Sequence, residues 1–196
     1  MRLRRAVVIG ITGTPSSGKS RLASIVAKEL PGSRIIEIGE VVRKAGFHTS
    51  YDRKDRSFVA NMAKLKAFLS EESKIGGTLV IVGHMLPDIG VSTDITIVVR
   101  ARLEDLYSRM RRRGYPRGKI RENISAEMSD YCGETSRNEG MKTFEVCSKT
   151  DEKRLVALIR RMRKQQGRIG ELPAHKTVNR GKEFESFVIA HPELGL

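Results

Sequence analysis

The sequence predicts an α/β fold in which a parallel sheet is covered by helices on both faces. Short apolar runs rich in β-branched residues alternate with segments whose apolar residues recur at helical spacing. The first run, residues 6–12, leads directly into GTPSSGKS at residues 13–20, which fits the pattern G-x-x-x-x-G-K-[ST]. Alternating strands and helices are typical of a parallel sheet, and the glycine-rich loop is typical of proteins that bind a nucleoside triphosphate.

The segment after the loop completes a strand–loop–helix unit. Its apolar residues keep helical spacing as far as Leu30, and Pro31 follows them. In such a unit the backbone N–H groups of the loop and the N-terminus of the helix face a polyphosphate. The Lys19 ammonium would reach the terminal phosphates, and the Ser20 hydroxyl would ligate Mg²⁺. The alternative is a chance glycine turn, which would require the flanking strand and helix to be accidental as well.

Composition sets further bounds. The 196 residues suit one domain with a sizeable core, and with aromatics at 5% aliphatic residues must fill that core. The net charge of +14 favours polyanionic partners such as nucleotides, RNA or anionic membranes. No apolar run approaches about 20 residues, so no membrane-spanning segment is expected. Cys132 and Cys147 lack the spacing of a zinc site or a disulfide framework, and we expect a cytoplasmic protein.

The remaining elements follow in order. Apolar runs predict four further strands, giving a five-stranded sheet, at residues 34–38, 78–82, 94–99 and 143–147. Apolar spacing and turn residues predict helices at residues 39–44, 57–75, 102–113, 119–135 and 151–166. Residues 48–56 are polar and are interpreted as a loop.

The chain divides into a main domain, residues 1–166, and a C-terminal extension, residues 167–196. Glycine and proline interrupt the extension repeatedly, and its basic and acidic residues balance. One short apolar group could anchor it, formed by Phe184, Phe187, Val188 and Ile189. We therefore expect a short helix or strand near residues 183–190.

A dense basic segment, residues 109–121, lies between two of the predicted helices. A run of charge is usually a solvated face. Here it follows the fourth strand of a sheet that carries a phosphate-binding loop, and in nucleoside monophosphate kinases an arginine-bearing lid occupies that place. Guanidinium groups neutralise the charge of a transferring phosphoryl group, and a closing lid excludes water. We therefore favour a lid at about residues 112–122 over a solvated face.

Four motifs together resemble the adenylate kinase isoenzyme six family. They are GTPSSGKS, IGEVVR after the second strand, the Gly-His pair after the third, and LYSRMRRRGY followed by KIRENISAEM. The resemblance covers residues 6–166 and is most specific in R-x-x-x-R-G-Y with E-N-x-x-x-E behind it. It implies a P-loop, nucleoside monophosphate kinase-like fold with a monophosphate-binding segment at about residues 39–60. It also implies a nuclear location if the source is eukaryotic.

The resemblance further implies an activity and partners. The family transfers the γ-phosphate of ATP to AMP or a related nucleoside monophosphate and hydrolyses ATP slowly, with Mg²⁺ as the metal. It acts in maturation of the small ribosomal subunit and forms a complex with the small-subunit ribosomal protein uS11. Two alternatives stay open: a nucleotide-switched ribosome-assembly ATPase or adaptor with little kinase activity, and a small-metabolite kinase, against which the R-G-Y segment argues.

RNA is a second partner that the sequence suggests, and the resemblance implies that this RNA would be ribosomal RNA. The last predicted helix of the main domain carries basic residues outside its apolar face, among them Arg160, Arg161 and Arg163. Nucleotide chemistry does not need them, whereas a phosphate backbone would use them. Surface charge that only maintains solubility is the alternative.

The resemblance assigns roles to residues of several segments. The ATP-binding set is Gly13, Ser16, Ser17, Gly18, Lys19, Ser20, Arg21, Arg113 and, beside the adenine, Lys149. The catalytic set is Lys19, His84, Arg109 and Arg113. The acceptor-monophosphate set is Glu40 and Arg43. For Arg43 and Lys149 the alternative is a surface position without a role, and for His84 it is a cap on the edge of the sheet.

One departure from the family concerns the metal. Family members carry an acidic residue at the end of the third strand, two residues before the histidine or directly before their Gly-His pair. Here Val82 and Gly83 stand at those positions. Ser20 and the phosphates could still hold Mg²⁺. Either Asp88 or Glu40 replaces the missing acid, or turnover is weak.

Overall fold

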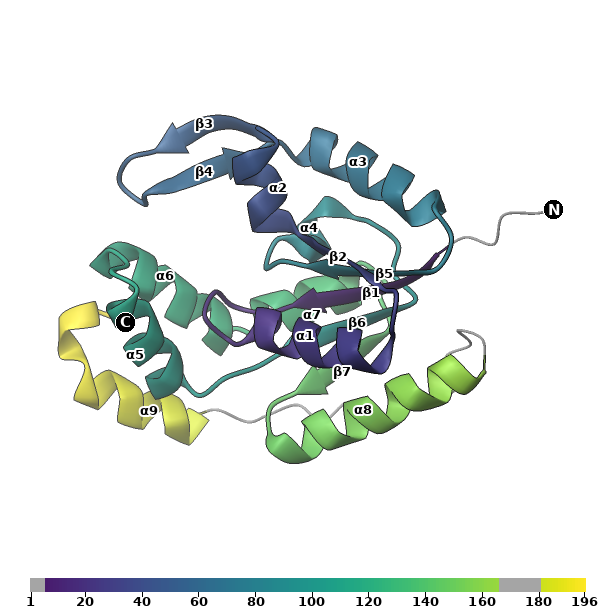
Figure 1. Cartoon of the computed structure of the whole chain (residues 1–196). Helices are drawn as coiled ribbons and strands as arrows, with labels where there is room; N and C mark the ends of the chain where they lie inside the picture. The colour runs from purple at the N-terminus through teal and green to yellow at the C-terminus, as the bar shows by residue number, and fades with distance from the viewer. Residues whose placement is uncertain (1–5, 166–180) are drawn as a thin grey trace.

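The computed structural model describes residues 6–165 and 181–196. Among these residues, five parallel strands form one sheet in the order β2-β5-β1-β6-β7 (Figure 1). The strands are β1 (Val7–Thr12), β2 (Arg34–Glu37), β5 (Thr78–Val82), β6 (Ile95–Val99) and β7 (Thr143–Val146). The five-stranded parallel sheet is therefore confirmed, and β1, which leads into the glycine-rich loop, lies at its centre.

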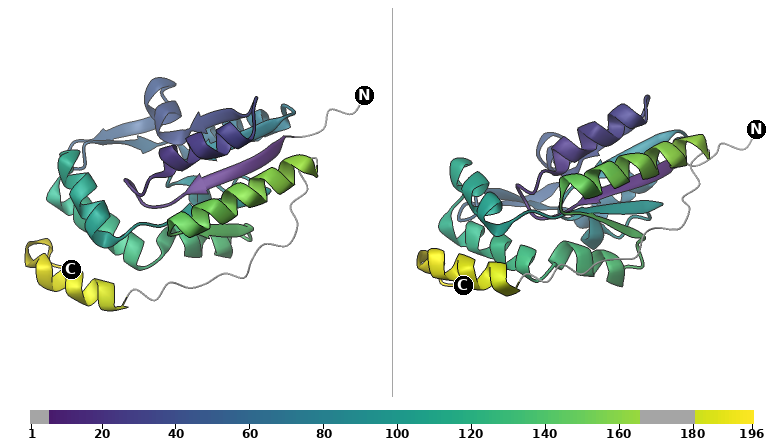
Figure 2. Two further views of the ribbon diagram at one scale, coloured as in Figure 1. Left: turned by 60° about the horizontal axis from the view of Figure 1, so that its bottom comes forward. Right: turned by 90° about the horizontal axis from the view of Figure 1, so that it is seen from below.

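Helices cover both faces of the sheet, as Figure 2 shows in two views. On one face α1 (Lys19–Glu29) and α8 (Lys149–Lys164) enclose a core cluster that includes Ile11, Leu22 and Val82. On the other face α2 (Ile38–Lys44), α3 (Met62–Lys74) and the short α4 (Leu86–Ile89) enclose a second cluster, which includes Val8 and Ile81. Successive side chains of a buried strand therefore point to opposite faces of the sheet and pack in the two different core clusters.

The segment after α2 differs from the prediction. Residues 48–60 form an antiparallel hairpin of β3 (His48–Asp52) and β4 (Ser57–Ala60), so the predicted loop at 48–56 and the predicted helix start at Ser57 are wrong. Contacts between rings of the two strands stabilise the hairpin. The ring centroid of Phe58 lies 5.1 Å from that of Tyr51 and 4.3 Å from that of His48. The helix begins only at Met62, after Asn61, whose side chain accepts a hydrogen bond from the Lys64 amide.

The predicted helix at 119–135 is two helices. These are α6 (Arg117–Met128) and α7 (Tyr131–Asn138), and they are separated at Asp130, whose φ of 53° lies in the left-handed region. The turn allows α7 to return to the sheet, where it contacts β6 and β7. The apolar spacing continued through the break, so the pattern alone could not place it.

The C-terminal residues pack on α5 (Leu103–Arg112). Within the expected segment 183–190 the structure has a helix, α9 (Gly181–Ala190), followed by a short 3-10 helix (Pro192–Leu194). Phe187 is buried in a third cluster with Leu103 and Leu106 of α5. Glu183 accepts a hydrogen bond of 2.8 Å from the Leu103 amide at the start of α5. The extension thus stabilises the helix that leads into the basic segment.

No helix within residues 6–165 and 181–196 has both the length and the apolar character needed to cross a membrane.

Candidate active site

The glycine-rich loop connects β1 to α1 at the carboxyl end of the sheet. Gly13 has a φ of 138°, and a Cβ there would collide with the Val99 carbonyl oxygen, so only glycine fits. Gly18 precedes α1 with a φ of 110° and open space where a Cβ would lie. The loop therefore has the backbone path that exposes N–H groups at a helix N-terminus, where phosphates bind.

Lys19 folds back over this loop. Its Nζ atom donates hydrogen bonds of 2.8 Å to the Gly13 carbonyl and 3.0 Å to the Thr14 carbonyl. Burial lowers the pKa of Lys19 from 10.5 to about 8, although carboxylates including Glu37 and Glu127 act to raise it. The ammonium is still predominantly charged at neutral pH, and it lies where the terminal phosphates of a bound nucleotide would replace the two carbonyls as its partners.

A buried carboxylate behind the loop ties it to α6. Thr14 donates a 2.5 Å hydrogen bond from its hydroxyl to Glu127. Arg100, at the end of β6, donates to the same carboxylate over 2.9 Å and also pairs with Asp130. Sequence reasoning missed this network. Its only signal was the second glutamate of E-N-x-x-x-E, which is Glu127.

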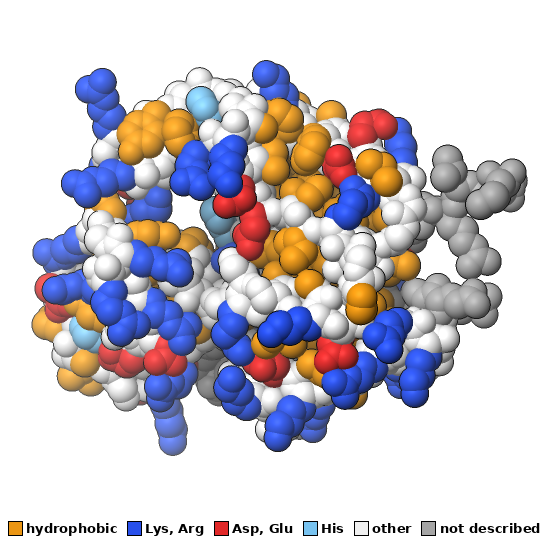
Figure 3. All heavy atoms as spheres, in the orientation of Figure 1, with side chains coloured by type: hydrophobic (Ala, Val, Ile, Leu, Met, Phe, Trp, Pro, Cys, Tyr) orange, Lys and Arg blue, Asp and Glu red, His pale blue; other side chains and the backbone are white. Residues whose placement is uncertain are grey.

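Two arginines of the basic segment that were predicted to be catalytic, Arg109 and Arg113, both contact the loop. Arg109 of α5 donates a 3.1 Å hydrogen bond to the Ser16 carbonyl, and Arg113 donates one of 3.1 Å to the Ser16 hydroxyl. Beyond the lid turn, Lys119 of α6 donates to the Asp55 carbonyl at 2.9 Å and so connects the lid with the tip of the β3–β4 hairpin. Figure 3 shows a hollow between this hairpin and the α5–α6 pair. Lid, loop and hairpin thus border one hollow.

His84 follows β5 beside the loop. Its backbone carbonyl accepts a 3.3 Å hydrogen bond from the Thr12 hydroxyl, and the residue keeps exposed surface. Desolvation, and next to it the charge of Lys19, lower the pKa of His84 from 6.5 to about 4. The imidazole is therefore neutral at physiological pH and can act as a hydrogen-bond partner but not as a cation.

This neutrality gives a pH prediction. His84 should titrate well below pH 6.5 in NMR spectra, with His84→Gln used to assign the signal. Because the unfolded imidazole binds a proton at higher pH than the folded one, stability should fall as the pH is lowered from about 6.5 towards 4. Turnover should show no loss from His84 protonation between pH 7.5 and 6. An apparent pKa of His84 near 6.5 in the folded protein would contradict the assigned environment.

Arg113 provides a second prediction. Arg113→Ala should lower turnover by roughly 10²-fold, because the guanidinium stabilises charge that develops on the transferring phosphoryl group. The loss should fall on kcat and leave ATP affinity nearly unchanged. Arg112→Ala is the matched control, since Arg112 is the adjacent exposed lid arginine. If Arg113→Ala kept the wild-type turnover, as Arg112→Ala should, the basic segment would be a solvated face.

Three other residues that were predicted to belong to the site have exposed side chains in the structure. Arg43 is 61% exposed and lies 3.9 Å from Glu40, which also pairs with Lys44. Lys149 is 80% exposed at the start of α8. Arg21 is 57% exposed and pairs with Glu152 of α8. Their assigned roles remain predictions that a bound nucleotide has to test.

Neither proposed substitute for the missing acid lies free beside the loop. Asp88 accepts a 2.6 Å hydrogen bond from Tyr131, although it lies near enough to His84 to act on its pKa. Glu40 is engaged on the exposed side of α2. Gly83 has no room for a side chain, because a Cβ would lie 2.7 Å from Ile38.

A metal would depend on the nucleotide for ligands. In the part of the chain that the structure describes, no group of three or more His, Cys, Asp or Glu side chains could hold a metal ion. Ser20 is exposed at the start of α1, next to Lys19. A hydroxyl at this position suits Mg²⁺ that is otherwise coordinated by phosphate oxygens and water.

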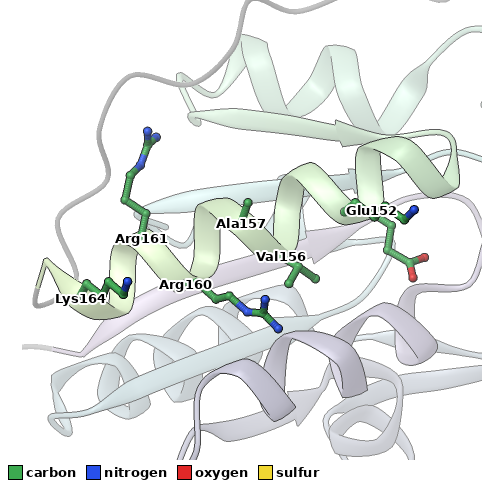
Figure 4. A pocket seen from close by; sticks show the side chains of 7 residues that line it. Glu152, Val156, Ala157, Arg160, Arg161 and Lys164 are labelled. Carbon is green, nitrogen blue, oxygen red and sulfur yellow. The ribbon is translucent and has the colours of Figure 1, made fainter.

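A cavity of about 550 Å³ lies elsewhere, along α8 (Figure 4). Its lining residues all belong to this helix: Glu152, Lys153, Val156, Ala157, Arg160, Arg161 and Lys164. Arg160 also pairs with Glu29 of α1 at 2.8 Å, and Arg163 donates to the Glu29 carbonyl. The basic face of α8 is therefore partly neutralised by α1, and the cavity does not mark the nucleotide site.

The fold and this site define a P-loop protein of the nucleoside monophosphate kinase class. Two solved structures have the same fold at low identity. Thymidylate kinase from Candida albicans matches with a TM-score of 0.52 and 18% identity, over 83% of this chain and 93% of that one. The tunicamycin resistance protein of Deinococcus radiodurans matches with a TM-score of 0.50 and 20% identity, over 86% of this chain and 100% of that one.

Proteins with similar sequences indicate the family, whereas the solved structures indicate only the fold. The family described as "AAA domain" matches residues 9–130. Proteins named "Putative adenylate kinase" are similar at 35% identity in Methanocaldococcus jannaschii, over 63% of this chain and 68% of that protein, and at 38% in Methanothermobacter thermautotrophicus, over 64% and 70%. The "Adenylate kinase isoenzyme 6 homolog" of Caenorhabditis elegans is 33% identical over 64% of this chain and 69% of that protein. The chain belongs to this AAA-domain family of adenylate kinase-like proteins and is a nucleoside monophosphate kinase-like enzyme.

Proposed function

We propose that the protein transfers the γ-phosphoryl group of ATP to AMP or a closely related nucleoside monophosphate. The observation that carries this proposal is the contact of Arg109 and Arg113 with Ser16, because it brings two guanidinium groups of the basic segment onto the phosphate-binding loop. A protein that only binds nucleotide does not need cations on both sides of the phosphates. Phosphoryl transfer does, since positioning and charge neutralisation supply most of its catalysis.

The roles of the residues follow from their places around the hollow. Loop N–H groups and Lys19 bind the β- and γ-phosphates, and the Arg109 and Arg113 side chains turn from Ser16 to the transferring phosphoryl group. Mg²⁺, when bound with ATP, neutralises phosphate charge, and Ser20 is the side chain that would ligate it. His84, being neutral, can hydrogen-bond a phosphoryl oxygen without adding charge.

The acceptor is proposed to bind on the α2 and hairpin side of the hollow. Arg43 would pair with its phosphate once the weak contact with Glu40 is released. The Lys119 contact with the hairpin closes the lid over this side and excludes water, which would otherwise compete as acceptor. The monophosphate-binding segment is thus proposed at residues 39–60 and the lid at residues 112–122.

A comparison of acceptors tests the proposal. ADP formation from ATP should depend on an added monophosphate, and AMP should give the highest kcat/KM among AMP, CMP, GMP, UMP and dTMP. Phosphate release from ATP alone should be slower. Rapid phosphate release that no monophosphate diverts would contradict the kinase function.

A second candidate is an ATPase of small-ribosomal-subunit maturation with little kinase activity. The observation that favours it is the apolar Val82 where an acid would assist the metal. In this case uS11 and ribosomal RNA would be the partners, and the RNA contact would fall to α8. The candidates for phosphate contacts are Arg160, Arg161 and Arg163, and an RNA phosphate would have to compete with Glu29 for Arg160. Phosphate release stimulated by uS11, together with RNA affinity that falls steeply with salt, would support this role.

A further inference from the structure

Glu37 is the last residue of β2 and stands next to the position of the missing acid. In the parallel pairing of β2 with β5, Glu37 lies opposite Val82, and Val82 in turn lies opposite Ile11 of β1. The three residues form one row across the carboxyl end of the sheet. Side chains of such a row point to the same face.

That face is the one covered by α1. Ile11 and Val82 both belong to the cluster beneath α1 and α8. Glu37 therefore directs its side chain to the side of the sheet from which Lys19 and Ser20 start α1. Val82, at 0% exposure, fills the core with its side chain, whereas Glu37 is half-buried at the rim.

Among the described residues, the Glu37 carboxylate has an electrostatic partner but no ion pair. It acts to raise the pKa of Lys19, so the two charges lie near each other. Glu37 immediately precedes α2, yet its side chain does not cap that helix. Figure 3 shows acidic side chains where β2 ends and α2 begins, at the edge of the hollow. A half-buried carboxylate without a hydrogen-bond donor is costly unless a cation or its water compensates it.

We propose that Glu37 takes over the metal-positioning role of the missing acid, by accepting hydrogen bonds from water bound to Mg²⁺ in the metal–nucleotide complex. Compared with the family position at Val82 of β5, Glu37 of β2 lies one strand away in the same row. The acid therefore stays at the carboxyl end of the sheet and on the face that α1 covers. The inference rests on the proposed use of ATP with Mg²⁺, and it makes Glu37 a positioning residue that does not touch the reacting atoms.

Metal binding without turnover tests this role. Mn²⁺ binding would be measured by electron paramagnetic resonance in the presence of a non-hydrolysable ATP analogue. Glu37→Gln should weaken Mn²⁺ binding to the protein–nucleotide complex by about 10-fold or more, as loss of outer-shell partners does. Without metal, the same variant should bind the analogue equally or more tightly, because a negative charge near the phosphates has been removed.

Two variants serve as comparisons. Glu71→Gln removes an exposed carboxylate of α3 that pairs with Lys74, and it should leave Mn²⁺ binding unchanged. Asp88→Asn tests the rival acid. The double variant Glu37→Gln/Val82→Asp returns a carboxylate to the family position and, if circular dichroism shows that it folds, should recover Mn²⁺ binding.

The outcomes separate this inference from the function on which it rests. Unchanged Mn²⁺ binding in Glu37→Gln, or a loss in Asp88→Asn alone, would overturn the role of Glu37 and leave the kinase proposal standing. Equal weakening of nucleotide binding with and without metal would mean that Glu37 only supports the fold. If the wild-type protein binds neither the analogue nor its Mn²⁺ complex, the proposed function fails together with this inference.

Discussion

Lys19→Ala is expected to abolish measurable ATP binding and to lower turnover by at least roughly 10³-fold. The substitution removes the only ammonium that the described structure holds within hydrogen-bond distance of the Gly13 and Thr14 carbonyls. Those carbonyls would then line the phosphate position without the charge that balances it. Titration calorimetry with ATP and a steady-state assay measure the two effects.

Lys28→Ala is the matched control for this experiment. Lys28 is exposed and lies in the last turn of the same helix, whereas Lys19 lies in its first turn. Its loss should change neither ATP affinity nor turnover. If Lys19→Ala kept micromolar affinity for ATP, the loop could not be the triphosphate site and the account of the hollow would be wrong.

Glu127→Ala is expected to destabilise the protein by about 3–5 kcal/mol, because it leaves the Arg100 guanidinium as a buried charge without its main partner. Arg100 and Glu127 are 5% and 2% exposed, so water cannot replace the lost carboxylate. The Thr14 hydroxyl loses its acceptor in the same step, which loosens the loop. Urea unfolding followed by circular dichroism measures the change in the free energy of unfolding.

The control for Glu127→Ala lies five residues earlier on the same helix. Glu122 is exposed, and Glu122→Ala should leave the free energy of unfolding nearly unchanged. A difference of less than about 1 kcal/mol between the two variants would show that the buried ion pair does not hold α6 to the loop.

The sheet and the phosphate-binding loop could be predicted because their determinants are local. Each buried strand is a short β-branched run, and the loop is defined by glycines at fixed spacing, of which Gly13 has no room for any other residue. The basic segment follows the fourth predicted strand, and in the structure its Arg109 and Arg113 contact Ser16 of the loop. Their catalytic role and the lid stay predictions.

The hairpin could not be predicted from the same signals. Both of its strands are largely exposed, so its sequence lacks the alternation that burial of one face produces. Its stability comes from cross-strand contacts such as that between Tyr51 and Phe58, which join residues that are not adjacent in sequence.

Two carboxylates near the loop, Glu127 and Glu37, were missed for a related reason. Glu127 meets Thr14 across 113 positions of the chain, and Glu37 meets its neighbour Val82 only through the pairing of β2 with β5. A sequence shows neither the register in which two strands such as β2 and β5 pair nor the contacts that a helix such as α6 makes with a distant loop. The sequence instead favoured Asp88 and Glu40, which stand closer to the recognised motifs.

Transfer of a labelled phosphoryl group tests the central claim most directly. The protein would be incubated with Mg²⁺, ATP labelled with ³²P in the γ-position and AMP, and the products would be separated, with Lys19→Ala as the inactive control. The account predicts that the label appears in ADP and that omission of AMP removes this product. Label that appears only as orthophosphate, at a rate that AMP does not alter, would contradict it.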